Sequence, residues 1–369
     1  MITLKVEINS KDKINYPIII GEDAGVEIAK YCKQFSCAKV LIVTNETIYE
    51  IYQEKMPKIF ADCGLQVEYC IVPDGEKYKN QEILDKILTC AFEAKLERND
   101  LFAAFGGGVI GDITGFAAAI YMRGVNFMQI PTTILAQVDS SVGGKVAINT
   151  PYGKNLLGAF YQPKVVISDL NFLKTLPERE ILTGLSEVIK YSFIEKTCAA
   201  DFHDFAKFLF ENNKAVLNRN LSVLSNVVKR CCELKAAVVK QDEKENGLRS
   251  ILNFGHTIGH AIEKCTQYNV FTHGEAVSIG MRGAFCISYK LKKINDEYFN
   301  FANNILSSYG FNFKIPENIS PDKIFEALSY DKKVKDGNIR FVLPVGYADV
   351  EIFDNIASDI IMESIKELY

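Results

Sequence analysis

The sequence predicts an α/β domain in its first half and a mostly α-helical domain in its second half. In the first half, short apolar runs alternate with helical patterns, and this alternation is typical of a largely parallel sheet covered by helices. From about Pro177 onward, long amphipathic helical patterns with few prolines take over. The length of 369 residues suits two domains and leaves ample chain for a large core. We therefore predict domains at 1–176 and 177–369, with the cleft between them as the expected active site.

The individual elements follow from the periodicity of apolar residues. An alternating stretch opens the chain, and further strand-like runs lie at 40–44, 65–72, 101–105, 127–130 and 164–168. Helical patterns cover 80–96, 221–241 and 279–293. Two late extended runs, 339–343 and 349–353, are joined by a short turn.

Composition and charge exclude several classes of function. The net charge of −4 and the pI near 5.8 argue against nucleic acid or an anionic membrane as a partner. The chain opens without a basic, apolar leader, and its apolar stretches are shorter than the ~18 residues of a membrane span. Ten cysteines are scattered without a CxxC spacing, which favours free thiols in a reducing compartment. We expect a cytoplasmic protein.

Histidines are rare but clustered. The chain has four, and His256, His260 and His273 lie close together in the sequence. On a helix, His256 and His260 would present both rings on one face, and His273 would return from the next turn or helix. Imidazoles are the most common ligands of zinc-like metals, so the cluster favours a metal site. Capped or core histidines are the alternative.

A glycine-rich segment, 106–112, directly follows the strand predicted at 101–105 and leads into a helix that we expect to begin near Ile113. Its Gly106, Gly108 and Gly111 satisfy G-x-G-x-x-G, a pattern that lets backbone amides approach a pyrophosphate. The acidic residue expected roughly twenty positions later is missing, so a structural glycine turn is an alternative. Polar residues at three further strand ends, 44–46, 73–79 and 131–133, favour a dinucleotide at this edge.

Isolated cations stand beside glycines or on predicted helices in the centre of the chain. Lys145 and Lys154 adjoin glycines, and Glu187 and Lys190 lie three residues apart on one helical face. Any one of these would ordinarily be a surface charge. Together with Lys235, Arg249 and the histidines, they indicate a pocket for a small polyanion.

These motifs resemble those of the 3-dehydroquinate synthases, within the sugar phosphate cyclases. The matching segments run from about residue 40 to 345 in the family's order and are 106–112, 129–133, 139–145, 153–155, 184–190, 249–260 and 273–275. Ser186 and Ile258 depart mildly from the family pattern, and neither is a polar contact. The resemblance implies a Rossmann-like NAD-binding domain, a metal-binding α-helical domain, and a homodimer.

The implied reaction converts 3-deoxy-D-arabino-heptulosonate 7-phosphate to 3-dehydroquinate and phosphate, a step of the shikimate pathway of aromatic amino acid biosynthesis. NAD⁺ is used and regenerated within one turnover. Transient oxidation acidifies the neighbouring C–H, phosphate leaves by β-elimination, and re-reduction, ring opening and an aldol closure follow.

The resemblance assigns the metal ligands to Glu187, His256 and His273, with His260 reserved for the substrate. It thus departs from the spacing argument, under which His256 and His260 would be joint ligands. The ion would be Zn²⁺ or Co²⁺, and three protein ligands leave positions open for two vicinal substrate hydroxyls.

By motif, the substrate contacts and other catalytic residues would be Asp139, Lys145, Asn155, Lys190, Lys235, Arg249, Asn253 and His260. Arg123 would reach the phosphate from the neighbouring subunit, and either Lys332 or Lys333 would complete the phosphate site. The cofactor contacts would be Asn45, Asp74, Gly75, Glu76, Lys77, Tyr78, Lys79, Gly107, Gly108, Val109, Ile110, Gly111, Asp112, Thr132, Thr133, Lys145, Lys154, Phe172 and Thr175.

Three alternatives compete with this interpretation. The first is another sugar phosphate cyclase, such as a 2-epi-5-epi-valiolone or 2-deoxy-scyllo-inosose synthase, whose substrate lacks the carboxylate that Lys235, Arg249 and Asn253 would hold. The second is a metal-dependent polyol dehydrogenase, which would release NADH. The third is a nucleotide-binding regulator without catalytic activity. Against it, proteins without catalytic activity rarely keep a complete set of catalytic residues.

Overall fold

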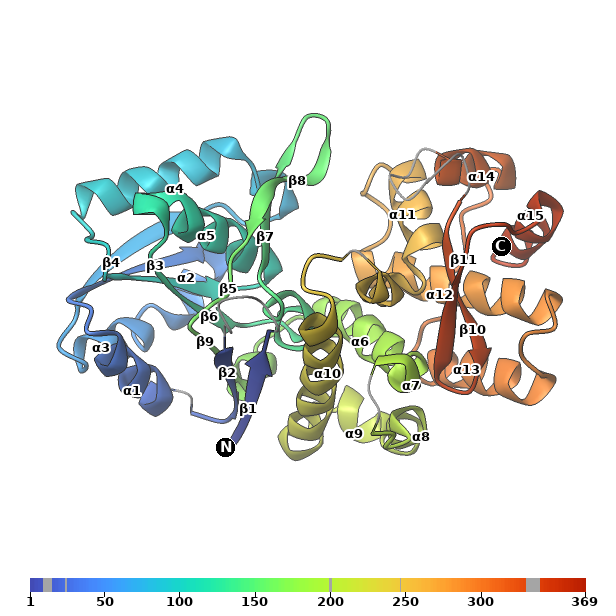
Figure 1. Cartoon of the computed structure of the whole chain (residues 1–369), viewed down its shortest axis with the longest axis horizontal. Coiled ribbons are helices and arrows are strands. Elements are labelled where there is room, and N and C mark those ends of the chain that lie inside the picture. Colours follow the sequence, from blue (N-terminus) through green and yellow to red (C-terminus); the bar gives the residue numbers. More distant parts are fainter. Residues whose placement is uncertain (9–14, 24, 199–200, 246, 330–338) are drawn as a thin grey trace. The chain divides into compact units, whose positions relative to one another are not determined.

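The computed structural model of the chain describes residues 1–8, 15–23, 25–198, 201–245, 247–329 and 339–369 (Figure 1). The chain divides into two compact units. The first comprises Met1–Pro177 and Leu224–Glu243, and the second comprises Glu178–Val223 and Lys244–Tyr369. The break at Pro177 lies beside the boundary expected from the sequence, whereas most of one later helix belongs to the first unit.

The first unit is built on a sheet in which seven described strands follow the order β1-β2-β9-β6-β5-β3-β4. β1 and β2 pair antiparallel, and all other neighbours in this order pair in parallel. The strands are β1 (Ile2–Glu7), β2 (Asn15–Gly21), β3 (Lys39–Asn45), β4 (Gln66–Val72), β5 (Leu101–Gly106), β6 (Asn126–Pro131) and β9 (Val165–Asp169). The predicted α/β class with a largely parallel sheet is confirmed.

Helices cover both faces of this sheet (Figure 1). On one face, Ile87 of α4 and Phe116 of α5 pack in a core with Phe102, and on the other, residues of α1 and α3 pack with Ile42 and neighbouring sheet residues. Because both faces are covered, strand β5 is buried along its whole length and reads as a continuous apolar run rather than an alternating one. The helices are α1 (Gly25–Phe35), α2 (Glu46–Tyr52), α3 (Met56–Ala61), α4 (Gln81–Glu93), α5 (Gly108–Ile120) and α10 (Leu221–Gln241).

A separate antiparallel hairpin of β7 (Lys145–Thr150) and β8 (Gly153–Phe160) also belongs to the first unit. The sequence did not predict it, because most of β8 is exposed and so lacks the apolar periodicity of a half-buried strand. The unit also contains the short helical turns η1 (Glu76–Tyr78), η2 (Tyr121–Arg123), η3 (Ala136–Ser140) and η4 (Leu170–Lys174).

The second unit is mostly helical, as predicted, with one antiparallel hairpin of β10 (Phe341–Gly346) and β11 (Asp349–Phe353). Its helices are α6 (Glu178–Phe193), α7 (Glu195–Cys198), α8 (Phe205–Glu211), α9 (Asn213–Leu217), η5 (Leu248–Asn253), α11 (His256–Cys265), α12 (His273–Lys290), α13 (Asp296–Ser308), α14 (Pro321–Ser329) and α15 (Ser358–Lys366).

The predicted starts of two helices are wrong. α5 begins at Gly108 rather than near Ile113, because the Gly111 amide already donates a helical hydrogen bond to the Gly107 carbonyl at 3.0 Å. α12 begins at His273 rather than at 279, because Thr272 caps it. In both cases polar or glycine residues of the first turn interrupt the apolar pattern on which the prediction relied.

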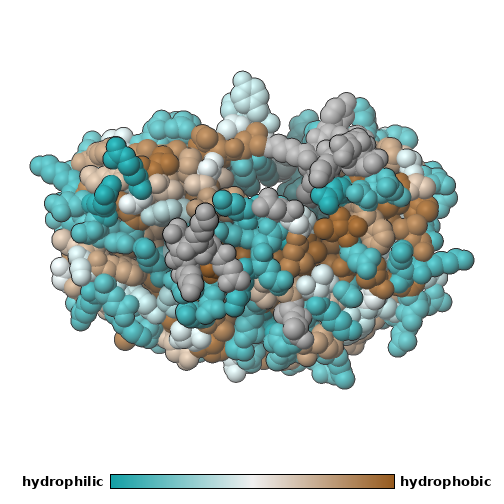
Figure 2. Space-filling model, in the orientation of Figure 1, coloured by the Kyte–Doolittle hydropathy of each residue, from teal (hydrophilic) through white to brown (hydrophobic). Residues whose placement is uncertain are grey.

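None of the described helices combines the length and the hydropathy that crossing a membrane requires. In Figure 2, hydrophilic and hydrophobic residues are interspersed over the visible face.

Candidate functional site

The three clustered histidines come together on two helices of the second unit. His256 and His260 lie one turn apart on α11, with ring centroids 5.4 Å apart, and the ring of His273, at the start of α12, lies 5.2 Å from that of His256. α12 packs against both α11 and α6. A glycine permits this close approach, because a Cβ at Gly280 would lie 1.9 Å from the Gly255 carbonyl oxygen.

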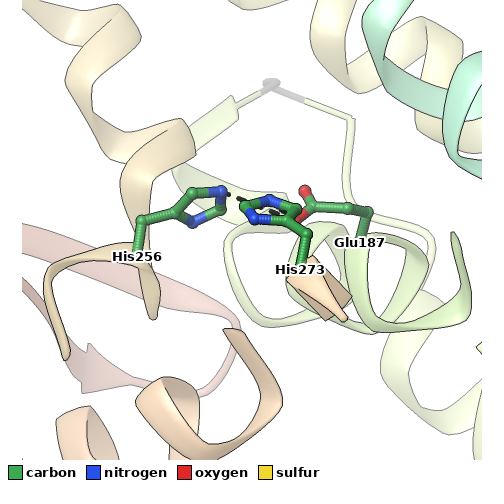
Figure 3. A group of neighbouring side chains, drawn as sticks. All are labelled: Glu187, His256 and His273. Carbon is green, nitrogen blue, oxygen red and sulfur yellow. Dashed lines mark ion pairs between the residues drawn. The ribbon is translucent and has the colours of Figure 1, made fainter. Parts of the chain in front are cut away.

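Glu187 of α6 completes a group that can hold a metal ion. Its Oε1 lies 3.5 Å from Nε2 of His256 and 3.7 Å from Nε2 of His273, and one ligand atom from each residue lies within 4.8 Å of the others. Figure 3 shows the three side chains pointing toward one another. This is the ligand set that the resemblance implies, and its donors are those of a catalytic zinc-type site.

The carboxylate of Glu187 is buried, at 1% exposure, and neither of its oxygens accepts a hydrogen bond of regular geometry from a residue that the structure describes. The ammonium of Lys190, one helical turn away and equally buried, forms an ion pair with Oε2. A buried carboxylate is costly unless cations or hydrogen bonds compensate it. The second oxygen, Oε1, faces the two imidazoles, so the residues present fit a divalent cation at this point.

The two imidazoles are oriented through their other nitrogens. Nδ1 of His256 lies 3.0 Å from the main-chain oxygen of Phe254, and Nδ1 of His273 lies 3.4 Å from Oε1 of Glu263. Partners of this kind leave the Nε2 lone pairs available to a metal. No motif in the sequence marks Glu263. Its spacing of three residues from His260 on the same helix was the available signal.

His273 is the first residue of α12, and a capping box holds that helix end in place. The Thr272 hydroxyl accepts a hydrogen bond from the Glu275 amide, and the Glu275 carboxylate accepts one from the Thr272 amide. Arg179 of α6 also binds both carboxylate oxygens, at 3.0 and 2.8 Å. Burial alone would raise the pKa of Glu275, but hydrogen bonds from Arg179 and Thr272 outweigh it and lower that pKa. The glutamate of the His-Gly-Glu motif therefore anchors the helix that carries His273.

The remaining predicted residues of the second unit lie on the same elements or next to them. Arg249 is fully buried in η5, and the Asn253 side chain donates to Glu245 Oε1 at 3.1 Å. Lys332, like its alternative Lys333, lies outside the described residues.

In the first unit, the predicted cofactor residues gather at the carboxyl ends of the parallel strands. Asn45 ends β3, and its side chain donates to Asp74 Oδ1, just beyond β4, at 2.7 Å. Beyond β5 and β6, the Thr132 amide donates to the Gly106 carbonyl at 3.0 Å. Because β4, β3, β5 and β6 are neighbours in that order, these strand ends form one continuous edge, where ligands of open parallel sheets bind.

The glycine segment lies in the middle of this edge. Gly107 is the N-cap of α5 and offers no side chain to the first helical amides. The backbone is close-packed at Gly111, where a Cβ would lie 2.8 Å from Oε1 of Gln129. An uncapped, glycine-lined helix start is where the phosphates of a nucleotide bind, so these residues, with Val109 and Ile110 in the same turn, fit a dinucleotide.

A buried lysine links the cofactor residues to a predicted substrate residue. Nζ of Lys79 donates to Asp112 Oδ2 at 2.5 Å and to Asn155 Oδ1 at 2.6 Å. Burial raises the pKa of Asp112, and the Lys79 ammonium opposes this effect. Asn155, for which the resemblance implies a phosphate contact, thus shares Lys79 with the predicted cofactor residue Asp112. The backbone φ of Asn155 is 54°.

Asn149 of β7, which was not among the residues predicted from the sequence, connects this group. Its side chain donates to Glu76 Oε1 at 2.7 Å and accepts from the Asn155 amide at 2.9 Å. Its own amide donates to the Lys79 carbonyl at 2.7 Å. No sequence motif marks this asparagine, because its partners Glu76 and Asn155 are far apart in the sequence. The fold brings them together where the hairpin packs against the 76–79 turn.

A second ion pair joins helix α10 to η3. Nζ of Lys235 lies 3.0 Å from Oδ1 of Asp139 and donates to the Asp139 carbonyl at 2.7 Å. Both residues were predicted to contact the substrate, and the structure brings them together within the first unit.

The other predicted residues of the first unit are more peripheral. Gly75 has a φ of 115°, which favours glycine, and Lys77 lies over the ring of Tyr78. Thr175 bonds to the Tyr52 hydroxyl at 2.7 Å, and the ring of Phe172 packs edge-on against that of Tyr52. The positions of the rest are Thr133, one residue beyond Thr132, Lys145 at the start of β7, Lys154 in β8 and Arg123 in η2, the last three exposed.

Sequence comparisons identify the family. The 3-dehydroquinate synthase N-terminal family matches residues 69–183, and the 3-dehydroquinate synthase C-terminal family matches residues 184–334. The chain belongs to the 3-dehydroquinate synthase family. A 3-dehydroquinate synthase of Francisella tularensis subsp. tularensis is 46% identical to it over 341 residues, which cover 92% of each protein.

Solved structures share the fold. A 2-deoxy-scyllo-inosose synthase complexed with carbaglucose-6-phosphate, NAD⁺ and Co²⁺ has a TM-score of 0.88 at 24% identity, with 100% of both chains covered. A 2-epi-5-epi-valiolone synthase from Streptomyces hygroscopicus subsp. jinggangensis, with NAD⁺ and Zn²⁺ bound, has a TM-score of 0.85 at 21% identity, with 98% of both chains covered. At these identities the likeness shows the fold alone. The 3-dehydroquinate synthase family assignment rests on the sequence relatives.

Proposed function

We propose that the chain is a 3-dehydroquinate synthase, a lyase that converts 3-deoxy-D-arabino-heptulosonate 7-phosphate to 3-dehydroquinate and phosphate in the shikimate pathway. The observation that carries the proposal is the buried Glu187 facing Nε2 of His256 and of His273 in a chain of this family. A site for a divalent cation agrees with a reaction that must acidify a hydroxyl before oxidation.

The cofactors of the proposed reaction are NAD⁺ and one divalent metal, Zn²⁺ or Co²⁺. When bound, NAD⁺ would accept and return a hydride within one turnover, and the metal would polarise the two vicinal hydroxyls of the substrate. Glu187, His256 and His273 would hold the metal. The strand-end residues of the first unit, from Asn45 through the start of α5 to Thr132, would hold NAD⁺ at the edge of the sheet.

The substrate is a dianionic phosphate with a carboxylate, and cations of this chain are proposed to bind both groups. Lys235, Arg249 and Asn253 would hold the carboxylate and the reacting hydroxyls, and Lys190, His260 and Asn155 would hold the phosphate. Lys190 and Lys235 are buried and each lies beside a carboxylate, Glu187 or Asp139. Such pre-formed pairs hold the ammonium groups in place before an anion arrives.

A homodimer is proposed from exposed apolar residues that neighbour Arg123 in the sequence or lie in β8. Ile120 and Met122 are exposed, and so are three apolar residues of β8, Leu156, Leu157 and Phe160. Tyr161, directly after β8, connects this strand to the segment after η2, because its hydroxyl donates to the Val125 carbonyl. Met122 and Arg123 both have positive φ, at 45° and 66°, a strained conformation that the surroundings must maintain. A second copy of the chain packed here would receive Arg123 at its phosphate site.

A reducing compartment, the cytoplasm, is proposed from the cysteines. All ten lie among the described residues, and all are free thiols, an arrangement typical of proteins that are not exposed to an oxidising environment.

The test is to supply the heptulosonate 7-phosphate with trace NAD⁺, and to follow phosphate release and absorbance at the NADH band. We expect many turnovers per NAD⁺, no accumulation of NADH, and 3-dehydroquinate as the product. Stoichiometric NADH without phosphate would instead establish a polyol dehydrogenase. Turnover of a carboxylate-free sugar phosphate, with none of the heptulosonate, would establish another cyclase.

A further inference from the structure

The two histidines that face Glu187 are oriented by acceptors of different kinds. Nδ1 of His256 points to a main-chain oxygen, which no substitution removes. Nδ1 of His273 points to the side chain of Glu263. Glu263 lies on α11, one turn after His260, and is 5% exposed. A side-chain acceptor buried beside one ring can be removed by substitution, so its effect on the metal centre is measurable.

We infer that Glu263 is the positioning residue that fixes the tautomer and the ring orientation of His273. A neutral imidazole carries one N–H, and an ionised carboxylate only accepts hydrogen bonds. The carboxylate therefore holds the proton on Nδ1 and leaves the lone pair of Nε2 directed at the metal position beside Glu187. This inference rests on the proposed function, because it assigns a role at the proposed metal centre.

A second group of potential ligands makes this assignment specific. His260, Glu263 and His273 also lie close enough to hold an ion, with their ligand atoms within 4.8 Å of one another. Glu263 contacts His273 at Nδ1, whereas Glu187 faces the Nε2 of the same ring. A neutral histidine has only one lone pair for a metal, so the two groups exclude each other at His273. The tautomer decides which of them binds the ion.

The pairing at Nε2 is favoured for a structural reason. In the group with Glu187, the second nitrogen of each histidine already faces a protein oxygen. In the group with Glu263, a metal at Nδ1 of His273 would replace the hydrogen bond from that nitrogen to Glu263. It would also leave the buried oxygen Oε1 of Glu187 without the metal that His256 and His273 would otherwise share with it. Glu263 is thus the acceptor that directs the ion toward Glu187.

The test compares Co²⁺ and Zn²⁺ binding to the full-length chain and to Glu263→Ala and Glu263→Gln, by competition with a chelator. We expect Glu263→Ala to weaken binding about 10- to 100-fold. Glu263→Gln should lose less, because its amide oxygen can still accept from Nδ1. Glu195→Gln is the matched control, since Glu195 is also buried in the second unit but accepts from the amides of His203 and Phe205. It should bind metal as the parent chain does.

A second measurement reports the tautomer directly. With only four histidines in the chain, the ring nitrogens can be assigned by ¹⁵N NMR in the metal-free and in the Zn²⁺-loaded protein. In the metal-free protein, where no metal sets the tautomer, His273 should carry its proton on Nδ1 in the parent chain and in Glu263→Gln, and should show a mixture of tautomers in Glu263→Ala. Circular dichroism of the metal-free proteins checks folding, and the Gln variant carries the test if the Ala variant does not fold.

The outcomes separate this inference from the proposed function. Equal metal affinity and an unchanged Nδ1–H tautomer in metal-free Glu263→Ala would overturn the positioning role alone. A metal bound at Nδ1 of His273 would show that Glu263 is itself a ligand and would also overturn that role. Failure of the parent chain to bind either metal would contradict the metal centre of the proposed function, whatever the variants do.

Discussion

At the residue scale, the metal position is defined by three side chains from three helices. Glu187 lies on α6, His256 starts α11 and His273 starts α12. Spacing could identify the histidines as a cluster, but it paired His256 with His260 because they share a helix face. The ring contacts show that His256 lies about as near to His273 as to His260. The choice of ligands therefore depends on where Glu187 lies, which spacing along the chain does not reveal.

We predict that His273→Ala loses the metal and lowers activity by more than about 100-fold while the fold persists. The side chain is 32% exposed, so truncation leaves little buried volume empty. Metal content, circular dichroism and turnover are the measurements. His203→Ala, which changes the exposed fourth histidine, should retain both metal and activity. Full activity of His273→Ala in metal-free buffer would contradict the assignment.

Asn149 is the second prediction at this scale. Asn149→Ala removes its side-chain bonds to Glu76 and to the Asn155 amide. We expect NAD⁺ to bind about 10-fold more weakly, equivalent to roughly 1.4 kcal/mol, as measured by calorimetric titration. Asn126→Ala serves as the control, since Asn126 begins β6 at the opposite edge of the sheet from the strand ends. Equal affinities of Asn149→Ala and the parent chain would show that the network does not organise the cofactor site.

At the element scale, the start of α12 combines a helix cap with the placement of a ligand. Thr272 and Glu275 form the capping box, Arg179 ties Glu275 to α6, and His273 lies between them in the first turn. Apolar periodicity placed the start of this helix at 279 because its first turn is polar. The S/T-x-x-E pattern of a capping box was present at 272–275 and would have located the true start.

Glu275→Gln is predicted to lower the free energy of unfolding by less than about 1 kcal/mol near neutral pH, because the side chain of its partner Arg179 is largely exposed. The folded pKa of Glu275 is lowered from 4.5. Its stabilisation is therefore fully present above pH 4.5 and is lost as the pH falls through the lower folded pKa. Denaturant titrations of both proteins across this range should show the difference shrinking only on the acidic side. A difference that persists or grows there would contradict the ion pair as its cause.

At the scale of the whole molecule, residues of one subunit are proposed to serve the site of another. Arg123 is exposed at a strained turn and follows the exposed Met122. Lys190, in contrast, is buried beside Glu187. In a shared site, one subunit supplies the arginine while the other supplies the rest.

We predict that Arg123→Ala and Lys190→Ala are each nearly inactive and that mixed dimers of the two recover activity. A mixed dimer contains one site with both Arg123 and Lys190 intact, so about a quarter of the parent activity is expected after random re-association of subunits, since half of the dimers are mixed and each has one of two sites. Differently tagged subunits verify that mixed dimers form. Verified mixed dimers without activity would rule out a shared site.

Much of this protein could be predicted from its sequence because the relevant signals are local. The buried strands of the parallel sheet are apolar runs, and α10 was predicted at its observed bounds. The glycine segment directly follows a strand in the sequence, so its position could be predicted without knowledge of the tertiary structure. The sequence motifs also indicated the family, which residue identities in a fixed order can do without coordinates.

Only the tertiary structure decided which side chains meet. Glu263 and Asn149 carry no motif of their own, and each matters because the fold brings it to a partner on another element: His273 on α12 and Glu76 before α4. The assignment of most of α10 to the first unit, where Lys235 meets Asp139, likewise depends on packing between segments far apart in sequence. Local sequence determines where helices and strands form, but contacts between them depend on the burial of their faces against one another, a property of the whole folded chain.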